Sequence, residues 1–299
     1  MGSIGELAAL ATAACWTGSA ISFEVASKRI GSVPVNLLRL LVAFLLLVGF
    51  GVLVHHRALP LDAPPEAWFW LSLSGLVGFT LGDLCLFRSF VVIGARRSML
   101  VMCIAPLTTT VLGYVALEET LRPLQVLGMV MTIGGVAWTI LEGHPDPESR
   151  DAGRRRRVWG VTLAAIGAVA QAGGLILSKQ GMTTFAEPFG ASQIRVLAGI
   201  AGFLVVFTLA GVWPKVTAAV KDSRALIYLT AGATLGPFLG VSLSLLAVHE
   251  TEAGVAAAIM SVVPVLILPI AWFRGERVSI RAVAGTLLAV AGVVVLFLA

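Results

Sequence analysis

The chain has 299 residues, of which 58% are hydrophobic and 12% are charged, and its formal net charge is +5. Soluble domains carry about 25% charged residues, so the composition excludes a soluble globular protein and indicates an integral membrane protein. The apolar runs are continuous, which excludes the alternating apolar and polar pattern of a β-barrel. In a membrane protein the excess of basic residues indicates topology, not nucleic-acid binding.

Ten apolar segments of helix-spanning length follow one another along the chain. They are expected at residues 4–26, 33–54, 68–90, 97–117, 122–141, 158–182, 190–212, 224–248, 252–274 and 279–298. We therefore predict an all-α membrane protein with ten transmembrane helices. The one clear linker is polar and charged, so we expect a first five-helix repeat at 1–141, a cytoplasmic linker at 142–157 and a second five-helix repeat at 158–299.

The two halves resemble each other at a nearly constant separation. "GFTLG" at Gly78–Gly82 is matched by "GPFLG" at Gly236–Gly240, and Arg39 is matched by Arg195. Because each half has an odd number of expected spans, the second half enters the membrane from the opposite face. This is an inverted repeat, the arrangement that many secondary transporters use for alternating access.

Lysine and arginine set the expected orientation. Most of the 21 basic residues fall in the loops after the odd-numbered spans, against Arg57, Arg122 and Lys179 on the other side. The positive-inside rule then places the odd loops in the cytoplasm and both termini outside.

The pattern of ten helices in two repeats, with glycine-rich third and eighth helices, resembles the drug/metabolite transporter superfamily in its EamA-type members. Pro106 and Pro264 lie in the fourth helix of each half, and Glu119 and Glu276 follow them. The resemblance implies gradient-coupled or facilitated export of small metabolites. The general similarity is to bacterial aromatic amino acid exporters, which implies a bacterial inner (plasma) membrane location.

Charged residues at membrane depth are candidates for a gate. Arg39 lies about 9 Å into its helix from the cytoplasmic side, and Asp83 and Glu24 are expected at a similar depth. We predict an inner gate of Arg39, Asp83 and Glu24, with a static ion pair as the open alternative. Arg88 points away from Asp83 around the helix, so we expect it at the membrane interface.

On the outer side we expect Arg195, the repeat partner of Arg39. The repeat partner of Asp83 is Val241, which cannot pair with an arginine. Arg195 is left with Glu250, Glu252, a backbone carbonyl or a substrate carboxylate as partners. Because only the first half has this aspartate, we expect the inner gate to be held closed more firmly than the outer gate.

Residues near the midplane are candidates for the substrate site. Trp16 offers a flat apolar face for an aromatic or apolar substrate, and Gln171 offers a donor and an acceptor. Thr17 and Ser19 add hydroxyls. The alternatives are core or lipid packing for Trp16 and hydrogen bonds to their own helix for the hydroxyls.

Glycine and proline mark expected packing faces and kinks. Small faces allow close helix approach, and prolines can free carbonyls that line a cavity. The candidates are Gly78, Gly82, Pro106, Gly236, Pro237, Gly240 and Pro264. Gly128, Gly135, Gly285 and Gly292 mark one face of the fifth and tenth helices, which we expect to hold the halves together.

Other function classes find little support. The nucleotide-binding pattern G-x-x-x-x-G-K-[ST] does not occur, and the "LGD" at Leu81–Asp83 has no second membrane aspartate for aspartyl protease chemistry. We expect no enzyme, no cofactor and no metal site, and no partner besides membrane lipid and a small-molecule substrate. We expect a monomer that exports aromatic or apolar amino acids from a central site by alternating access, with a lipid flippase or a passive channel as alternatives.

Overall fold

The computed structural model describes residues 2–105, 107, 108, 111, 123–141, 150–250, 256, 259–275 and 278–298. These residues form helices joined by short turns, and no strand occurs among them. Six of the described helical segments are long and apolar enough to cross a membrane, and three shorter helices are apolar. Parts of the expected fourth and ninth spans, including Pro106, lie outside the described residues, so the count of ten stays a prediction.

The first half begins with two long helices, α1 (Gly2–Ile30) and α2 (Ser32–His55). A continuous helical segment follows, made of α3 (Pro65–Gly75), the π-helix η1 (Leu76–Gly82) and α4 (Asp83–Ile93). The half ends with α5 (Ala95–Val101) and α7 (Pro123–Leu141). Gly31 and Gly94 separate neighbouring helices at φ of 86° and 83°, a backbone conformation that favours glycine.

The second half repeats this order. It runs through α8 (Arg150–Met182), α9 (Pro188–Leu209), α10 (Trp213–Ala219), α11 (Ser223–Ala233), the π-helix η3 (Thr234–Gly240), α12 (Val241–Glu250), α14 (Val263–Phe273) and α15 (Ile280–Leu298). Two boundaries differ from expectation. The helix α8 begins inside the expected linker 142–157, because arginine is a good helix former, and the short helix α10 was not expected.

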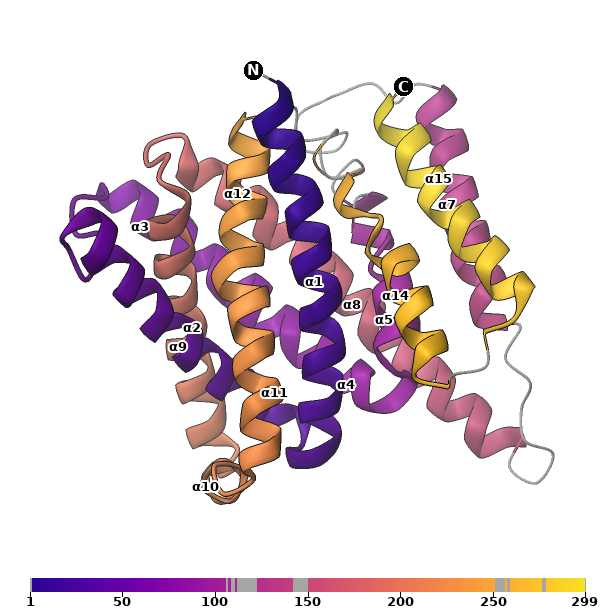
Figure 1. Ribbon diagram of the computed structural model, residues 1–299, viewed down its shortest axis with the longest axis horizontal. Helices are drawn as coiled ribbons and strands as arrows, with labels where there is room; N and C mark the ends of the chain where they lie inside the picture. Colours follow the sequence, from indigo (N-terminus) through magenta and orange to yellow (C-terminus); the bar gives the residue numbers. More distant parts are fainter. Residues whose placement is uncertain are drawn as a thin grey trace.

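The two halves interlock. The segment α3–η1–α4 of the first half packs against α8, and the segment α11–η3–α12 of the second half packs against α1. The pairs α2 and α9, and α7 and α15, also lie side by side (Figure 1). Each helix is therefore paired with a helix from the other half, so the space between the halves is enclosed by both.

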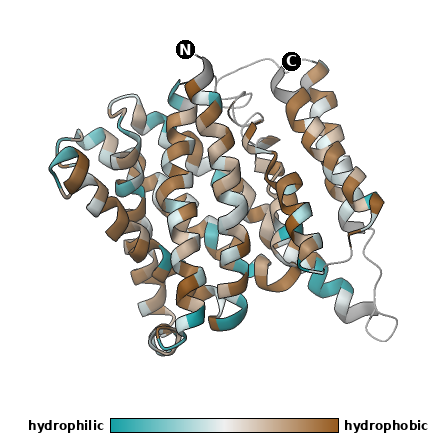
Figure 2. Ribbon diagram, viewed as in Figure 1, coloured by the Kyte–Doolittle hydropathy of each residue, from teal (hydrophilic) through white to brown (hydrophobic). Residues whose placement is uncertain are grey.

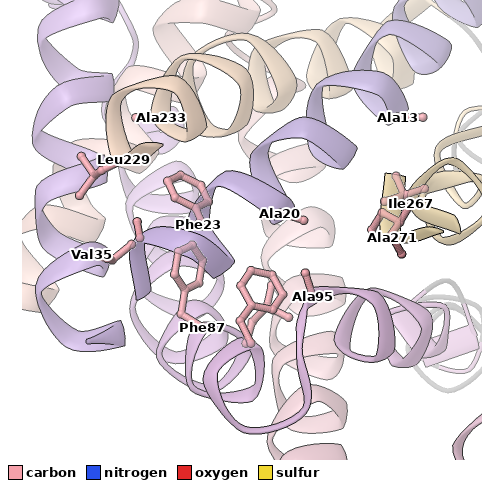
Figure 3. Packing of buried hydrophobic residues seen from close by; sticks show 14 residues of the cluster. Ala13, Ala20, Phe23, Val35, Phe87, Ala95, Leu229, Ala233, Ile267 and Ala271 are labelled. Atoms are coloured by element: carbon pink, nitrogen blue, oxygen red, sulfur yellow. The ribbon is translucent and has the colours of Figure 1, made fainter. Parts of the chain in front are cut away.

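Aromatic side chains fill the core beneath this space. Phe23 of α1 and Phe87 of α4 lie with ring centroids 4.9 Å apart, and Val35 of α2 and Leu229 of α11 pack near them (Figure 3). A second cluster, around Phe203 and Phe207, fills the contact between α2 and α9.

Many large apolar residues of the helices are exposed, as expected for a surface that faces lipid. Figure 2 shows hydrophobic residues along most of the helices. The start of α1 and the end of α15 lie at one end of the molecule (Figure 1). The end of α1 and the starts of α8 and α11 lie at the opposite end, together with the end of α14. This opposite end carries Lys28, Arg29, Arg154, Arg155, Arg156, Arg224 and Arg274, and we refer to it as the basic end.

Candidate functional site

A cavity of about 280 Å³ lies between the two halves. It is lined by residues of α1, α2, α4, α5, α8, α9, α12 and α14 and of both π-helices. The charged groups at its wall are Arg39, Asp83 and Arg195, joined by the amide of Gln171. The rest of the wall is mostly aromatic, aliphatic and sulfur-containing, so a few charged and amide groups lie in an otherwise apolar lining.

Arg39 and Asp83 form a buried ion pair in the cavity wall. The Arg39 Nη2 donates to Asp83 Oδ2, and both side chains are 4% exposed. The guanidinium also lies over three rings, with its Cζ 4.5 Å from the Phe87 centroid, 5.6 Å from Phe23 and 5.7 Å from Phe79. The matched depths of the two residues had predicted this contact, while its role as a gate stays a prediction.

Gln171 completes the coordination of Asp83 from the other half. Its Nε2 donates to Asp83 Oδ1 at 2.7 Å and to the Gly78 carbonyl at 3.3 Å. Both carboxylate oxygens of Asp83 therefore have partners, one on α2 and one on α8. The sequence placed Gln171 near the cavity but gave no sign of its contact with Asp83, which depends on the packing of α8 against η1.

Arg195 lines the cavity, and its expected place on the outer side of the transport path stays a prediction. Its side chain is buried, and its Cζ lies 5.0 Å from the Phe79 centroid. Glu250, one of its expected partners, is exposed and lies 3.9 Å from His249, and Glu252 is outside the described residues. Arg195 lies two turns inside α9, on the face that packs against η1.

Glu24 does not join Arg39 and Asp83, which corrects its place in the expected inner gate. Its carboxylate binds Lys28 at 2.7 Å and Arg274 at 3.1 Å. Lys28 lies one turn along α1 and Arg274 follows α14, so Glu24 belongs to a separate cluster at the basic end. Depth alone had suggested the wrong partners, whereas the i, i+4 spacing to Lys28 was a usable signal.

The expected substrate residues of α1 separate into two groups. Trp16 and Ser19 line the cavity, and the Trp16 indole packs against Gly240. The Ser19 hydroxyl donates to the Gly232 carbonyl of α11 at 3.0 Å. Thr17 is buried and donates to Ala13 of its own helix at 2.8 Å, so the back-bonding alternative holds for Thr17.

The two π-helices occupy equivalent positions in the halves, and sequence reasoning missed both. In η1, Gly78 and Gly82 face Gly174 and Ala170 of α8. A Cβ added at Gly82 would lie 3.3 Å from the Ala170 Cβ, a tight contact, whereas one added at Gly78 would make an ordinary contact with Gly174 at 3.9 Å. In η3, Gly236 and Gly240 face Ser19 and Trp16 of α1. Asp83 follows η1 directly, with its backbone N–H on the Gly78 carbonyl. The wider turn thus sets the direction in which Asp83 enters the cavity.

Helices α5 and α14 have breaks at the cavity. A turn at Met102 and Cys103 follows α5, and a turn at Ser261 and Val262 precedes α14. Pro264 stands in the first turn of α14, and Pro237 stands inside η3, so the first starts a helix and the second accompanies a widened turn. Discontinuous helices at mid-membrane depth are typical of transporter binding sites.

Comparison with known proteins gives the following. Residues 3–141 and 158–298 each match the model of the EamA-like transporter family. A solved structure titled only "Crystal structure of protein" aligns over 97% of this chain and 94% of its own, with a TM-score of 0.66 and 18% identity, which is a likeness of fold. No curated protein matches the sequence.

Proposed function

The chain belongs to the EamA-like transporter family, and on that premise we propose that this multi-pass membrane transporter of small solutes is a secondary exporter of amino acids with aromatic or apolar side chains. The observation that carries the proposal is the cavity between the halves. Its lining divides by chemistry into charged and amide groups, which are Arg39, Asp83, Gln171 and Arg195, and apolar groups, which include aromatic rings and methionines. Such a division suits a solute with a charged head and an apolar side chain.

The proposed mechanism is alternating access between two inverted repeats. Each half contributes one π-helix and one broken helix to the cavity wall. Because every helix of one half is packed on a helix of the other, rocking of one half against the other would open the cavity to one side at a time. In this scheme Arg39, Asp83 and Gln171 link α2, α4 and α8, and the Glu24 cluster links α1 to the residue after α14.

The gathering of Lys and Arg at the basic end supports the expected orientation. We propose that this end faces the cytoplasm of a bacterial inner membrane and that both termini face outside. Asp222 lies at the same end and binds Arg29 at 3.0 Å, so the basic end also joins α1 to the start of α11.

The test is flux into proteoliposomes loaded with amino acids on one side, with and without a proton gradient. Saturable flux with trans-stimulation supports a carrier, and a gradient dependence identifies proton coupling. Flux that rises linearly with concentration favours a passive channel, and transfer of a labelled lipid between leaflets in place of amino acid flux favours a flippase. We expect Trp16→Ala to weaken transport of aromatic amino acids more than that of small ones, because the indole lines the cavity.

We further propose that the monomer is the functional unit, since one chain supplies both repeats. Dilution of the protein to one copy per liposome should leave the flux per molecule unchanged. A flux per molecule that falls on dilution would contradict this.

A further inference from the structure

Arg195 is a buried cation whose hydrogen-bonding groups are not used by the protein. Its side chain belongs to the cavity wall, and the whole residue is 4% exposed. Its Nε has no hydrogen-bond partner, and among the described residues no acceptor bonds to its guanidinium. The Phe79 ring under the guanidinium stabilises the charge but cannot accept its five N–H groups.

The charges at the cavity wall do not balance. The described lining contains two guanidinium groups, Arg39 and Arg195, and one carboxylate, Asp83. Asp83 is already held, with Oδ2 on Arg39 and Oδ1 on Gln171. Asp83 also attracts Arg195 but makes no hydrogen bond to it. A buried cation whose N–H groups have no acceptor is costly, so an additional anion would complete the site.

The cavity of about 280 Å³ that Arg195 lines leaves room for that anion. Gly78 has no side chain, and a Cβ added there would lie 3.5 Å from both Arg195 Nη2 and Gln171 Oε1. The cavity lining also includes the side chains of Met99, Met102 and Met260, with Phe87 and Phe90. Methionine side chains adapt to irregular apolar ligands and make favourable contacts with aromatic rings.

We infer that Arg195 binds the carboxylate of a small organic anion whose apolar part lies against the methionine and phenylalanine side chains of the cavity. This inference rests on the proposed transport function and narrows its substrate class to apolar carboxylates. The guanidinium suits the ligand because its planar fork matches two carboxylate oxygens. The carboxylate is common to an aromatic amino acid and to the corresponding acid without an amino group, and the described lining offers no free carboxylate to an ammonium group.

Three probes of matched shape separate these chemistries: L-phenylalanine, 3-phenylpropionate and phenethylamine. Each is titrated into the purified full-length protein in detergent, and binding is followed by thermal stabilisation. We expect both carboxylates to stabilise the protein and the amine, which lacks a carboxylate, to have no effect. Higher affinity for phenylalanine than for 3-phenylpropionate identifies an amino acid site. Higher affinity for 3-phenylpropionate identifies a site for acids without an amino group. Stabilisation by phenethylamine equal to that by the carboxylates would overturn the inference.

Substitution of Arg195 provides the second test. Arg195→Gln should weaken binding of the carboxylate probes by about tenfold or more, since a charge-assisted pair is lost, and Arg195→Lys should weaken it less. The matched control is Arg88→Gln, because Arg88 is exposed on α4 and does not line the cavity. Unchanged carboxylate affinity in a folded Arg195→Gln or Arg195→Lys protein would overturn the inference.

Flux measurements keep this inference separate from the proposed function. Carboxylate binding that depends on Arg195 in a protein without any flux would support the inference and contradict the transport proposal. Flux of apolar carboxylates that is unchanged in Arg195→Gln would support transport and contradict the role of Arg195.

Discussion

At the scale of single residues, we expect substitution of Asp83 to change stability and transport the most. It balances the charge of Arg39 and receives Gln171 from the other half. We predict that Asp83→Asn lowers the stability by about 3–5 kcal/mol, the usual cost of leaving one charge of a buried pair alone, and that it alters transport. The matched control is Val241→Thr, since Val241 is the repeat partner of Asp83 and lines the same cavity. Thermal unfolding in detergent measures the stability, and flux into proteoliposomes measures transport. Equal and negligible changes of flux in both variants would contradict the gate proposal.

A double substitution separates a gate from a static pair. Replacing both members of a buried pair with apolar residues of similar size is often neutral or stabilising, so Arg39→Met combined with Asp83→Leu should recover most of the lost stability. A gate whose charges must separate during transport predicts that flux stays altered in this variant. Recovery of both stability and wild-type flux would mean that the pair only holds α2 and α4 together.

At the scale of secondary-structure elements, the contact of α7 with α15 is built on glycine. A Cβ added at Gly135 would collide with backbone atoms of Gly285 and Ala289, whereas one added at the neighbouring Gly134 meets nothing within 4 Å. We predict that Gly135→Ala destabilises the protein by about 1–3 kcal/mol through overpacking. Gly134→Ala should be neutral or stabilising by up to about 1 kcal/mol because alanine favours helix. Thermal unfolding of the two variants checks this, and equal stabilities would contradict it.

The start of α11 gives a prediction about pH. The backbone N–H of Ala225 donates to Asp222 at 3.0 Å and lowers the pKa of that carboxyl, and Arg29 of α1 lowers it further. Because the folded-state pKa lies below that of the unfolded chain, the carboxylate stabilises the fold above its ordinary pKa. This contribution is lost as pH falls through the lowered value.

Asp222→Asn can still cap the helix but cannot pair with Arg29, so we expect a small loss of stability at neutral pH that shrinks as pH falls through the acidic range. Thermal unfolding across pH measures it. The control Arg29→Gln should show the same small loss, and a difference that grows on acidification would contradict the assignment.

The elements also show what a sequence can and cannot predict here. The α7–α15 contact face could be predicted because small residues recur on one face of each helix. The Arg39–Asp83 contact could be predicted because an unpaired charge in hydrocarbon is costly. The partners of Glu24 were not predicted, because depth along a helix does not fix the direction in which a side chain points. The π-helices depend on how closely Gly78 and Gly236 approach the facing helices, which is a tertiary property.

At the scale of the whole molecule, the interlocked halves explain why a mixed-charge site can lie so deep. The cavity wall draws Arg39 and Asp83 from α2 and α4 of the first half, and Gln171 and Arg195 from α8 and α9 of the second. The first half therefore supplies the ion pair, and the second half supplies the amide that binds Asp83 and a second guanidinium. In the proposed mechanism, movement of one half relative to the other would change the Gln171–Asp83 contact and the position of Arg195 relative to that carboxylate, whereas the Arg39–Asp83 pair lies within the first half. This couples the state of the cavity to its ligand, because an added anion changes the partner of a guanidinium without leaving any charge alone.

The orientation of the molecule is the remaining consequence of its charge distribution. The basic end gathers the ends of α1 and α14 with the starts of α8 and α11, while the start of α1 and the end of α15 lie at the other end (Figure 1). If the basic end is cytoplasmic, a green fluorescent protein fused after the C-terminus should remain dark, because it does not fold after export by the general secretory route. An alkaline phosphatase fused at the same position should be active. The control places both reporters in the segment 142–149, next to the arginines of α8, where the fluorescence should be strong and the phosphatase inactive. A fluorescent C-terminal fusion together with an inactive phosphatase would reverse the orientation, and the Arg39–Asp83 pair would then belong to the outer side of the transport path.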